Sequence, residues 1–194
     1  MVKVEINGVQ KQYKVGTTYE EIAKEYQAQY NDLIGLVCVN GKIRELFKTV
    51  KKDCKVSFFT LRDDVGYKTY VRTATMLFLK AVYDVFGNEV AQKAHVEFAV
   101  GNGSYITMGG RVESTEQVAQ KLKERMQEIC KAGTPFMKSS YPLDDAMELF
   151  KEKGMEDKER LFRYRRSSLV NIYEIDGYYD YYYCLLYTSP SPRD

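Results

Sequence analysis

The sequence contains little of the material from which metal sites and disulfide frameworks are built. Among 194 residues there is no tryptophan, a single histidine (His95) and four cysteines. No Cys-x-x-Cys pair occurs, and outside the last eleven residues the cysteines are Cys38, Cys54 and Cys130. An odd number of isolated thiols is typical of buried free cysteines in a reducing compartment. We expect no zinc site, because one histidine would require an unusual ligand set.

Long apolar runs and a large excess of one charge are also lacking. The longest apolar candidate, residues 75–86, is interrupted by Lys80 and Asp84 and falls short of the roughly eighteen residues that a membrane span needs. The first residues alternate like a strand and lack the apolar core of a signal peptide. A net charge of +2 gives no global reason to bind nucleic acid. We expect a cytoplasmic protein with no membrane partner.

The last eleven residues differ from the rest. They run from Cys184 to Asp194 and read letter for letter like the translation of a common transposase sequencing adapter fused to an open reading frame. We therefore expect residues 184–194 to be a non-native tail, and the native sequence to stop near Tyr183, inside a strand. A genuine Ser/Pro-rich flexible terminus is the alternative that this composition permits.

Strand signals dominate the first sixty residues. Asn7-Gly8 separates two alternating segments, residues 2–6 and 9–15, and favours a hairpin with a type I′ turn. Residues 33–39 form a nearly continuous apolar run, which is typical of a buried central strand. The remaining strands expected here are residues 42–46, which follow Asn40-Gly41, and residues 55–61.

A helix is expected between these strands. Thr17 and Thr18 each stand three residues before a glutamate, the capping-box spacing of a helix start, and the helix runs toward Tyr30. A hairpin, one helix and further strands in sixty residues predict a ubiquitin-like β-grasp fold for residues 1–61. Together with Gly8, Gly41 and the ending Val56-Ser-Phe-Phe-Thr60, this order resembles the TGS domain, which is named for threonyl-tRNA synthetase, GTPases and a stringent-response synthetase.

Residues 62–183 predict a second, larger α+β domain after the polar joint at residues 63–66. Its elements alternate in type, and most of them end at a glycine. The expected helices are residues 73–86, a helix that opens at Ser114 and Gln117 and ends at Gly133, and residues 143–153. The expected strands are residues 95–100, 104–108, 169–175 and 178–183.

The order of a TGS-like module, a long amphipathic helix and a strand pair around residues 96–105 looks like the N-terminal half of threonyl-tRNA synthetase. In that family the second domain edits mischarged tRNA, and its site begins with a His-x-x-x-His pair on the helix. Here Arg72 and Met76 stand at those positions. A guanidinium is a permanent cation and a thioether is a soft ligand, so neither replaces an imidazole. We expect a degenerate editing-like domain that does not hydrolyse mischarged tRNA.

A second resemblance covers nearly the whole chain up to Tyr183. Bacterial uridine kinase-like proteins carry the same pair of domains ahead of a kinase domain, and they too have lost the two histidines. Five segments carry this resemblance: Leu79 to Gly87, Gly154-Met155 with Asp157-Lys158, Tyr164-Arg165, Ser168 to Tyr173, and Asp180 to Tyr183.

Phosphoryl transfer is not expected of this chain itself. A kinase of that type needs Gly-x-x-x-x-Gly-Lys-Ser/Thr, whose backbone amides and lysine hold the phosphates, and the sequence has no such string. Gly101 to Ser104 and Gly109-Gly110-Arg111 lack the adjacent lysine and hydroxyl pair of that motif, and they favour hairpin connections. The resemblance implies ATP and magnesium only for a missing C-terminal kinase domain, and we expect no cofactor in this chain.

One local basic and aromatic cluster occurs. In a functional interpretation its cations grip the phosphates of a nucleotide or RNA and its tyrosine stacks on a base. In a structural interpretation, which we favour, the run is a solvated face whose charges are balanced by nearby acids. The cluster, called here the basic segment, consists of Lys158, Arg160, Arg163, Tyr164, Arg165 and Arg166.

Two further features weigh less. The tyrosines of residues 178–183 form either a recognition surface or, as we prefer, a strand that contacts the missing domain. His95 has no carboxylate or nucleophile fixed to it by a motif, so a strand position explains it better than catalysis.

The sequence favours a non-catalytic, regulatory or ligand-binding N-terminal region of a uridine kinase-like nucleoside kinase, with the absent kinase domain as its partner. The alternative is an RNA-binding or tRNA-editing-related fragment of a threonyl-tRNA synthetase-like protein. A third hypothesis is that the fragment exposes a surface meant for the missing domain and is unstable alone.

Overall fold

The computed structural model describes residues 1–101, 103–109 and 112–186. The fold is α+β, as the sequence predicts, and the described residues divide into two compact units. The first comprises residues 1–73 and 184–186, and the second comprises the described part of 74–183. Expectations that concern Asn102, Gly110, Arg111 and the tail beyond Leu186 fall outside the described residues.

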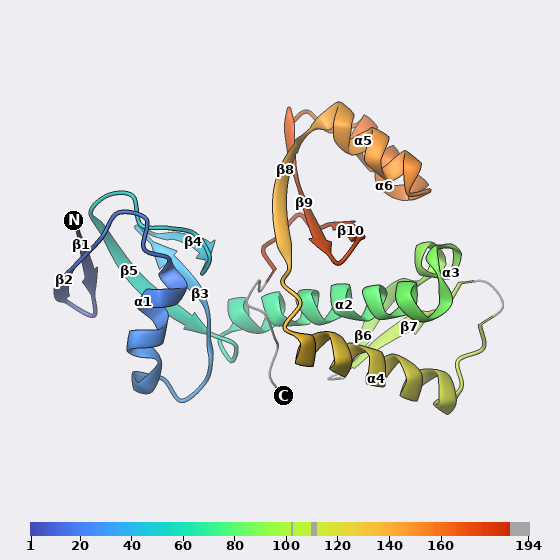
Figure 1. Ribbon diagram of the computed structural model, residues 1–194, viewed down its shortest axis with the longest axis horizontal. Helices are drawn as coiled ribbons and strands as arrows, with labels where there is room; N and C mark the ends of the chain where they lie inside the picture. Colours follow the sequence, from blue (N-terminus) through green and yellow to red (C-terminus); the bar gives the residue numbers. More distant parts are fainter. Residues whose placement is uncertain (102, 110–111, 187–194) are drawn as a thin grey trace. The chain divides into compact units, whose positions relative to one another are not determined.

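The first unit is built on a five-stranded mixed sheet (Figure 1). The strand order is β2-β1-β5-β3-β4, so β2 and β4 are its two edges. Strands β1 and β5 are parallel, whereas the pairs β1–β2, β3–β4 and β3–β5 are antiparallel. The strands are β1 (Val2–Ile6), β2 (Val9–Tyr13), β3 (Ile34–Val39), β4 (Lys42–Glu45) and β5 (Cys54–Thr60).

The hairpin turns adopt the backbone conformation that the sequence predicts. Asn7 and Asn40 have φ angles of 51° and 49°, and the glycines that follow them have φ angles of 79° and 80°. Two consecutive residues with positive φ define a type I′ turn, whose twist matches that of the flanking strands. Both Asn-Gly predictions are therefore confirmed.

Helix α1 (Tyr19–Tyr26) crosses this sheet and is followed by the short 3₁₀ helix η1 (Gln27–Gln29). Of the two possible capping boxes, Thr18 with Glu21 forms: the Thr18 hydroxyl accepts from the Glu21 amide at 3.2 Å, and the Glu21 carboxylate accepts from the Thr18 amide at 2.8 Å. Helix α1 buries Tyr19, Ile22 and Ala23 against valines and isoleucines of the strands, which form the core of the unit.

Helix α2 (Asp64–Phe86) begins nine residues before the start that the sequence predicts at residue 73, and the division between the two units falls within it. The Asp63 carbonyl accepts from the Tyr67 amide at 2.8 Å and so opens the first turn. Gly66 lies in this turn, and sequence analysis took residues 63–66 for a joint between the two domains because glycine is unfavourable inside a helix. At Gly87 the chain restarts as the short helix α3 (Asn88–Lys93).

The remaining helices and one hairpin follow. Strands β6 (His95–Val100) and β7 (Gly103–Thr107) pair antiparallel, as expected. Helix α4 (Glu116–Ala132) is capped by Thr115, whose hydroxyl accepts from the Val118 amide, and not by Ser114 as the sequence suggested. Gly133 ends this helix in the left-handed conformation, as expected.

A three-stranded antiparallel sheet in the order β10-β9-β8 completes the second unit. Strand β8 was not predicted, because its sequence lacks an apolar alternation and most of it is exposed. Phe150, Phe162 and Tyr173 are fully buried in the core of this region. The elements are β8 (Met137–Pro142), α5 (Leu143–Glu152), α6 (Glu156–Arg163), β9 (Leu169–Ile175) and β10 (Tyr178–Tyr181).

The structure also bears on the expectations about membrane-spanning helices and about the cysteines. Among the described residues, no helix has both the length and the apolar character needed to cross a bilayer. The described cysteines form no disulfide, and Cys38, Cys54 and Cys130 are half-buried, not buried as expected.

Candidate functional site

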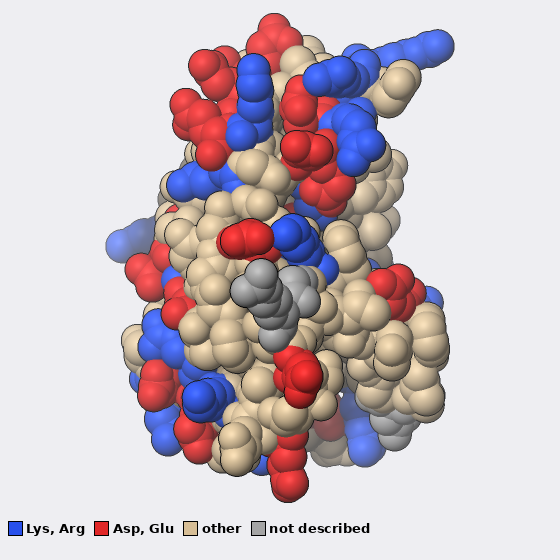
Figure 2. Space-filling model, turned by 90° about the vertical axis from the view of Figure 1, so that its right-hand side faces the viewer, with Lys and Arg blue, Asp and Glu red and all other residues tan. Residues whose placement is uncertain are grey.

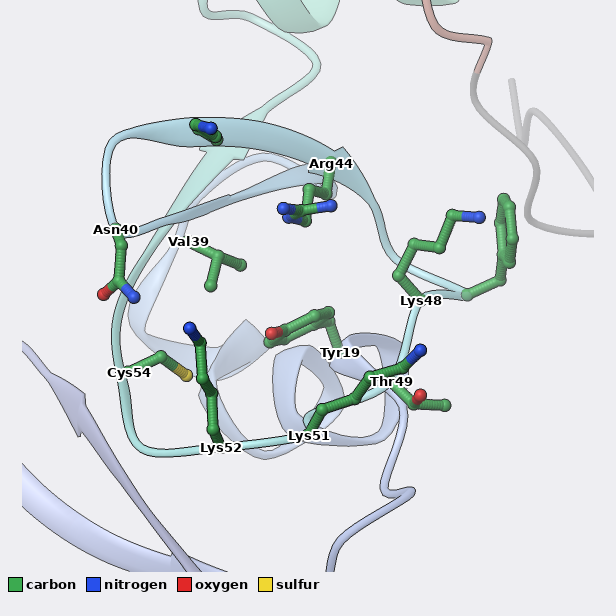
Figure 3. Close-up of a pocket in the computed structure, with 11 residues that line it drawn as sticks. Tyr19, Val39, Asn40, Arg44, Lys48, Thr49, Lys51, Lys52 and Cys54 are labelled. Carbon is green, nitrogen blue, oxygen red and sulfur yellow. The ribbon is translucent and has the colours of Figure 1, made fainter. Parts of the chain in front are cut away.

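A basic pocket lies within the first unit (Figure 3). Its volume is about 670 Å³, and its walls come from α1, the β3–β4 turn, β4, the loop that follows β4, and the start of β5. Five of its eleven lining residues are basic, and none is acidic. These five side chains, called here the pocket cations, are Lys42, Arg44, Lys48, Lys51 and Lys52.

Local structure explains why these cations gather. Lys42 and Arg44 are two residues apart on the edge strand β4, so their side chains leave the sheet on the same face. The loop that carries the three lysines is held against the start of α1 by backbone hydrogen bonds. The Tyr19 amide donates to the Lys48 carbonyl at 2.9 Å, and the Val50 amide donates to the Thr17 carbonyl at 2.9 Å.

Acidic residues of the same stretch do not line the pocket. Glu45 is buried, with 3% of its surface exposed. Asp53 accepts a hydrogen bond from the Lys3 amide at 2.8 Å. Among the residues that the structure describes, no carboxylate forms an ion pair with a pocket cation. One of these cations has an aromatic neighbour instead, because the Lys48 ammonium lies 4.6 Å from the centre of the Phe47 ring.

Tyr19 lies near the centre of the lining residues in Figure 3, where Arg44 is drawn above its hydroxyl end and the Lys52 ammonium to the left of it. The Cys54 side chain also lines the pocket. Burial, helped by Cys54, raises the pKa of Tyr19 to about 12. Burial also raises the pKa of the Cys54 thiol, an effect that the neighbouring Tyr19 opposes only in part. Both groups therefore remain protonated at neutral pH.

This arrangement is suited to holding an anion. Five positive charges without carboxylate partners attract phosphate or carboxylate groups, and the guanidinium of Arg44 can form two parallel hydrogen bonds to one such group. A protonated thiol is a poor nucleophile. The pocket therefore has the means to bind a ligand, and the residues that line it offer no activated nucleophile.

The sequence alone did not reveal this pocket. The pocket cations are not contiguous along the chain but are spread over residues 42–52 and interrupted by Glu45. The usable signal was the alternation of Lys42 and Arg44 on an expected strand, followed by Lys51-Lys52 in the next loop. Only the fold shows that Glu45 points into the interior.

The basic segment, which sequence analysis did identify, lies in the second unit on and after α6. Its first cation, Lys158, is paired with Asp180: the ammonium lies 3.1 Å from the carboxylate, whose side chain is only 4% exposed. Burial lowers the pKa of Lys158, but Asp180 and Asp157 outweigh burial, and the pKa is raised overall. Burial raises the pKa of Asp180, an effect that Lys158 opposes.

Other members of the basic segment also have neighbours within the unit. Arg163 pairs with Glu159 at 2.6 Å, and Arg160 donates to the Glu156 carbonyl at 3.4 Å. Arg165 donates to the Tyr181 hydroxyl and lies over its ring. Basic and acidic side chains are intermixed at the top of Figure 2, where α5 and α6 lie.

Four members of the basic segment are exposed to solvent. Tyr164 is 89% exposed, and Arg160, Arg163 and Arg166 are exposed as well. Of these three cations, Arg163 is already paired with Glu159. The assignment of the segment as a ligand site stays a prediction.

Arg72 and Met76, at the positions of the two editing histidines, lie one turn apart on α2. Met76 is fully buried. Arg72 donates to the Leu185 carbonyl at 3.1 Å and to the Thr69 hydroxyl at 2.8 Å. Both side chains are thus engaged in packing or in hydrogen bonds within the protein. Over the described residues, no three His, Cys, Asp or Glu side chains gather in a way that could hold a metal ion.

Of the tyrosines near the end of the chain, Tyr178 is buried and Tyr183 is 85% exposed. Burial raises the pKa of Tyr178 far above its usual range, and the negative charge of the nearby Asp180 adds a smaller effect in the same direction. The lone histidine, His95, lies on the exposed strand β6.

No family model matches the chain. Similarity to curated proteins is nevertheless extensive. The chain is 29% identical to the threonine–tRNA ligase of Thermotoga maritima over 182 residues, which cover 88% of this chain and 28% of the ligase. The corresponding enzyme of Clostridium kluyveri is 25% identical over 93% of the chain and 28% of the ligase. That of Pelagibacter ubique is 27% identical over 69% of the chain and 20% of the ligase.

These relatives are threonyl-tRNA synthetases, and the matched part is their N-terminal region. The chain spans about 28% of the length of the Thermotoga and Clostridium ligases that it matches. The resemblance to a TGS domain and an editing-like domain agrees with this similarity. The uridine kinase interpretation receives no support from these relatives, and the alternative that sequence analysis left open is the better one.

Proposed function

We propose that this chain is an RNA-binding N-terminal region of a threonyl-tRNA ligase-like protein, and that the pocket cations contact the phosphates of tRNA. The observation that carries the proposal is the set of five cations around Tyr19, none of which pairs with a carboxylate in the part of the chain that the structure describes. The relatives act on tRNA by their names, which makes a polyanionic RNA the natural ligand.

The energetic argument rests on counterion release. Each phosphate that a protein cation neutralises frees a counterion, so affinity falls with salt in proportion to the number of contacts. Cations already paired within the protein contribute little to this effect. The pocket cations are available for such contacts, whereas Lys158 and Arg163 of the basic segment already have carboxylate partners.

Catalysis of editing by this chain is not part of the proposal. Met76 is buried and Arg72 is bonded to Leu185 and Thr69, so these positions present no imidazole to a water or a metal. A deacylation assay with mischarged tRNA should show no hydrolysis above the spontaneous rate. Hydrolysis that disappears on replacement of Arg72 would contradict this part of the account.

A filter-binding titration with tRNA over a salt series tests the proposed function. Five phosphate contacts predict that log K falls against log salt with a slope of about −3.5 to −4.5. The double variant Lys51→Ala/Lys52→Ala should flatten that slope by about 1.4 to 1.8. The control variant Lys11→Ala/Lys24→Ala removes the same charge, but its two lysines already pair with Glu25 and Glu20. A flat salt dependence, or equal effects of the two double variants, would overturn the proposal.

A further inference from the structure

The basic site of the first unit is hollow, and its size limits what can enter it. A volume of about 670 Å³ lies within the range of small-molecule sites and exceeds what a lone phosphate ion needs. A base-paired duplex presents its phosphates on the outside of a cylinder about 20 Å wide and can only touch the rim. A free nucleotide, or an unpaired nucleotide at the end of a strand, can enter.

The wall has two chemical parts. Of the pocket cations, Arg44 and Lys52 carry charged groups that Figure 3 draws toward the hydroxyl end of Tyr19, one from above and one from the left. The rings of Tyr19 and Phe47 and the methyl groups of Val39 supply apolar wall. A site for inorganic phosphate alone has no need of that apolar part. A nucleotide combines a flat, largely apolar base with charged phosphates, and it therefore matches both parts.

One side chain adds a donor for recognition of a base or sugar. The Asn40 side-chain oxygen accepts from the Lys55 amide at 2.8 Å, which fixes the orientation of the group and leaves its NH₂ available. Figure 3 shows Asn40 at the side of the pocket opposite Lys48. Polar groups held by the backbone lose little entropy when they bind a ligand.

We propose that this pocket binds one phosphate-bearing nucleotide that is not base-paired, with Arg44 and Lys52 on its phosphates. The proposal deepens the proposed function, on which it rests for the identity of the site. The same chemistry is offered by a free nucleotide and by the end of an RNA strand. Separate arms of the experiment distinguish these two sources.

Isothermal titration calorimetry of the full chain with ATP, adenosine and inorganic triphosphate, without magnesium, tests whether a free nucleotide binds. We expect ATP to bind at least about tenfold more tightly than either adenosine or triphosphate. Adenosine lacks the phosphates that the cations attract, and triphosphate lacks the base that the apolar wall can contact. Arg44→Ala should weaken ATP binding about tenfold. Arg44→Lys should weaken it less, because lysine keeps the positive charge and loses only the two parallel hydrogen bonds that a guanidinium can form. The control variant Lys11→Ala should leave ATP binding within twofold.

The strand-end arm measures competition against labelled tRNA by a single-stranded octamer with a 5′ phosphate and by a blunt duplex of the same sequence. Competition by the octamer but not by ATP supports the proposal with a strand end as the source. Equal competition by the octamer and the duplex would overturn it, and so would a lack of both ATP binding and competition by the octamer. Where ATP does bind, equal affinities for adenosine and ATP, or equal effects of Arg44→Ala and Lys11→Ala on ATP binding, would also overturn it. If tRNA binding keeps its salt slope in those cases, the proposed function survives. ATP binding without any tRNA binding would overturn the proposed function alone.

Discussion

The pocket cations and the basic segment each contain five positively charged side chains, yet the structure uses them differently. In the basic segment Lys158 and Arg163 are paired with carboxylates at 3.1 and 2.6 Å. The two acidic residues close to the pocket cations in sequence do not pair with them. Glu45 is buried, and Asp53 accepts a hydrogen bond from the backbone amide of Lys3. The comparison teaches that a count of basic residues along the sequence does not measure the charge available to a ligand.

The largest effect should come from Lys158, because its removal leaves a buried charge. Lys158→Met removes the ammonium that pairs with the Asp180 carboxylate, and the Asp180 side chain is only 4% exposed. Loss of one partner of a buried pair costs about 3–5 kcal/mol in the free energy of unfolding. The matched change Lys52→Met should alter that free energy by less than about 0.5 kcal/mol. Chemical denaturation of the full chain measures both.

A double substitution provides the control for this prediction. Lys158→Met/Asp180→Asn removes both charges and should be less destabilised than Lys158→Met alone. If Lys158→Met and Lys52→Met prove equally mild, Lys158 is not a structural cation and the contrast between the two regions fails.

Lys80 is a buried cation of the second unit, and its substitution can be compared with that of Lys158. The Lys80 ammonium lies 2.7 Å from Asp84 and 3.2 Å from Asp176. Lys80→Met should destabilise the chain by about 2 kcal/mol, less than Lys158→Met, because Asp84 keeps Arg125 and Asp176 is largely solvated. Thermal or urea unfolding gives the value. A destabilisation that exceeds that of Lys158→Met would contradict this ranking.

Binding should show the opposite ranking. Arg44→Ala should weaken tRNA binding about tenfold at low salt, because an unpaired guanidinium loses its phosphate contact. Arg163→Ala should change tRNA binding by less than twofold, since its charge is already matched by Glu159. Filter binding at one fixed low salt concentration compares the two variants. A larger loss for Arg163→Ala would move the RNA site to the second unit.

The smallest effect is a pH dependence of stability in the first unit. Hydrogen bonds from Thr18 lower the pKa of Glu21, and the hydrogen bond from Lys11 lowers that of Glu25. A carboxyl whose pKa is lower in the folded state stabilises the protein above its unfolded-state pKa. This stabilisation is lost as the pH falls through the lowered value.

Glu21→Gln/Glu25→Gln should therefore weaken the decline of the unfolding midpoint between pH 5 and pH 3, and it should leave tRNA binding at pH 7 unchanged. Unfolding curves at several pH values measure the slope. An unchanged slope would show that these two pairs are not coupled to folding.

Much of the fold could be predicted because local chemistry and tertiary structure agree there. The Asn7-Gly8 and Asn40-Gly41 turns and the Thr18–Glu21 capping box each fix a backbone conformation within a few residues. Strand β8 was missed because pairing with β9, and not its own apolar pattern, makes residues 137–142 a strand. The early start of α2 was missed because Gly66, a poor helix former, lies in its first turn.

The candidate site was harder to predict than the fold. The pocket depends on the edge position of β4 and on the loop that β4 and α1 hold between them, neither of which is visible in the spacing of basic residues. Conversely, the pairing of Lys158 with Asp180 joins residues 22 positions apart, and sequence analysis counted only the nearer acids. Charge balance in a folded chain is decided by side-chain direction and by pairing across elements.

The central claim is that RNA contacts the pocket cations and not the basic segment. Arginine and lysine footprinting of the unmodified chain tests it most directly: phenylglyoxal and acetylating reagents are applied with and without tRNA, and the modified residues are read by mass spectrometry. The account predicts that tRNA protects Arg44, Lys51 and Lys52 while Arg163 and Arg166 react as before. Protection of Arg163 and Arg166, with Arg44 and Lys52 left reactive, would contradict it.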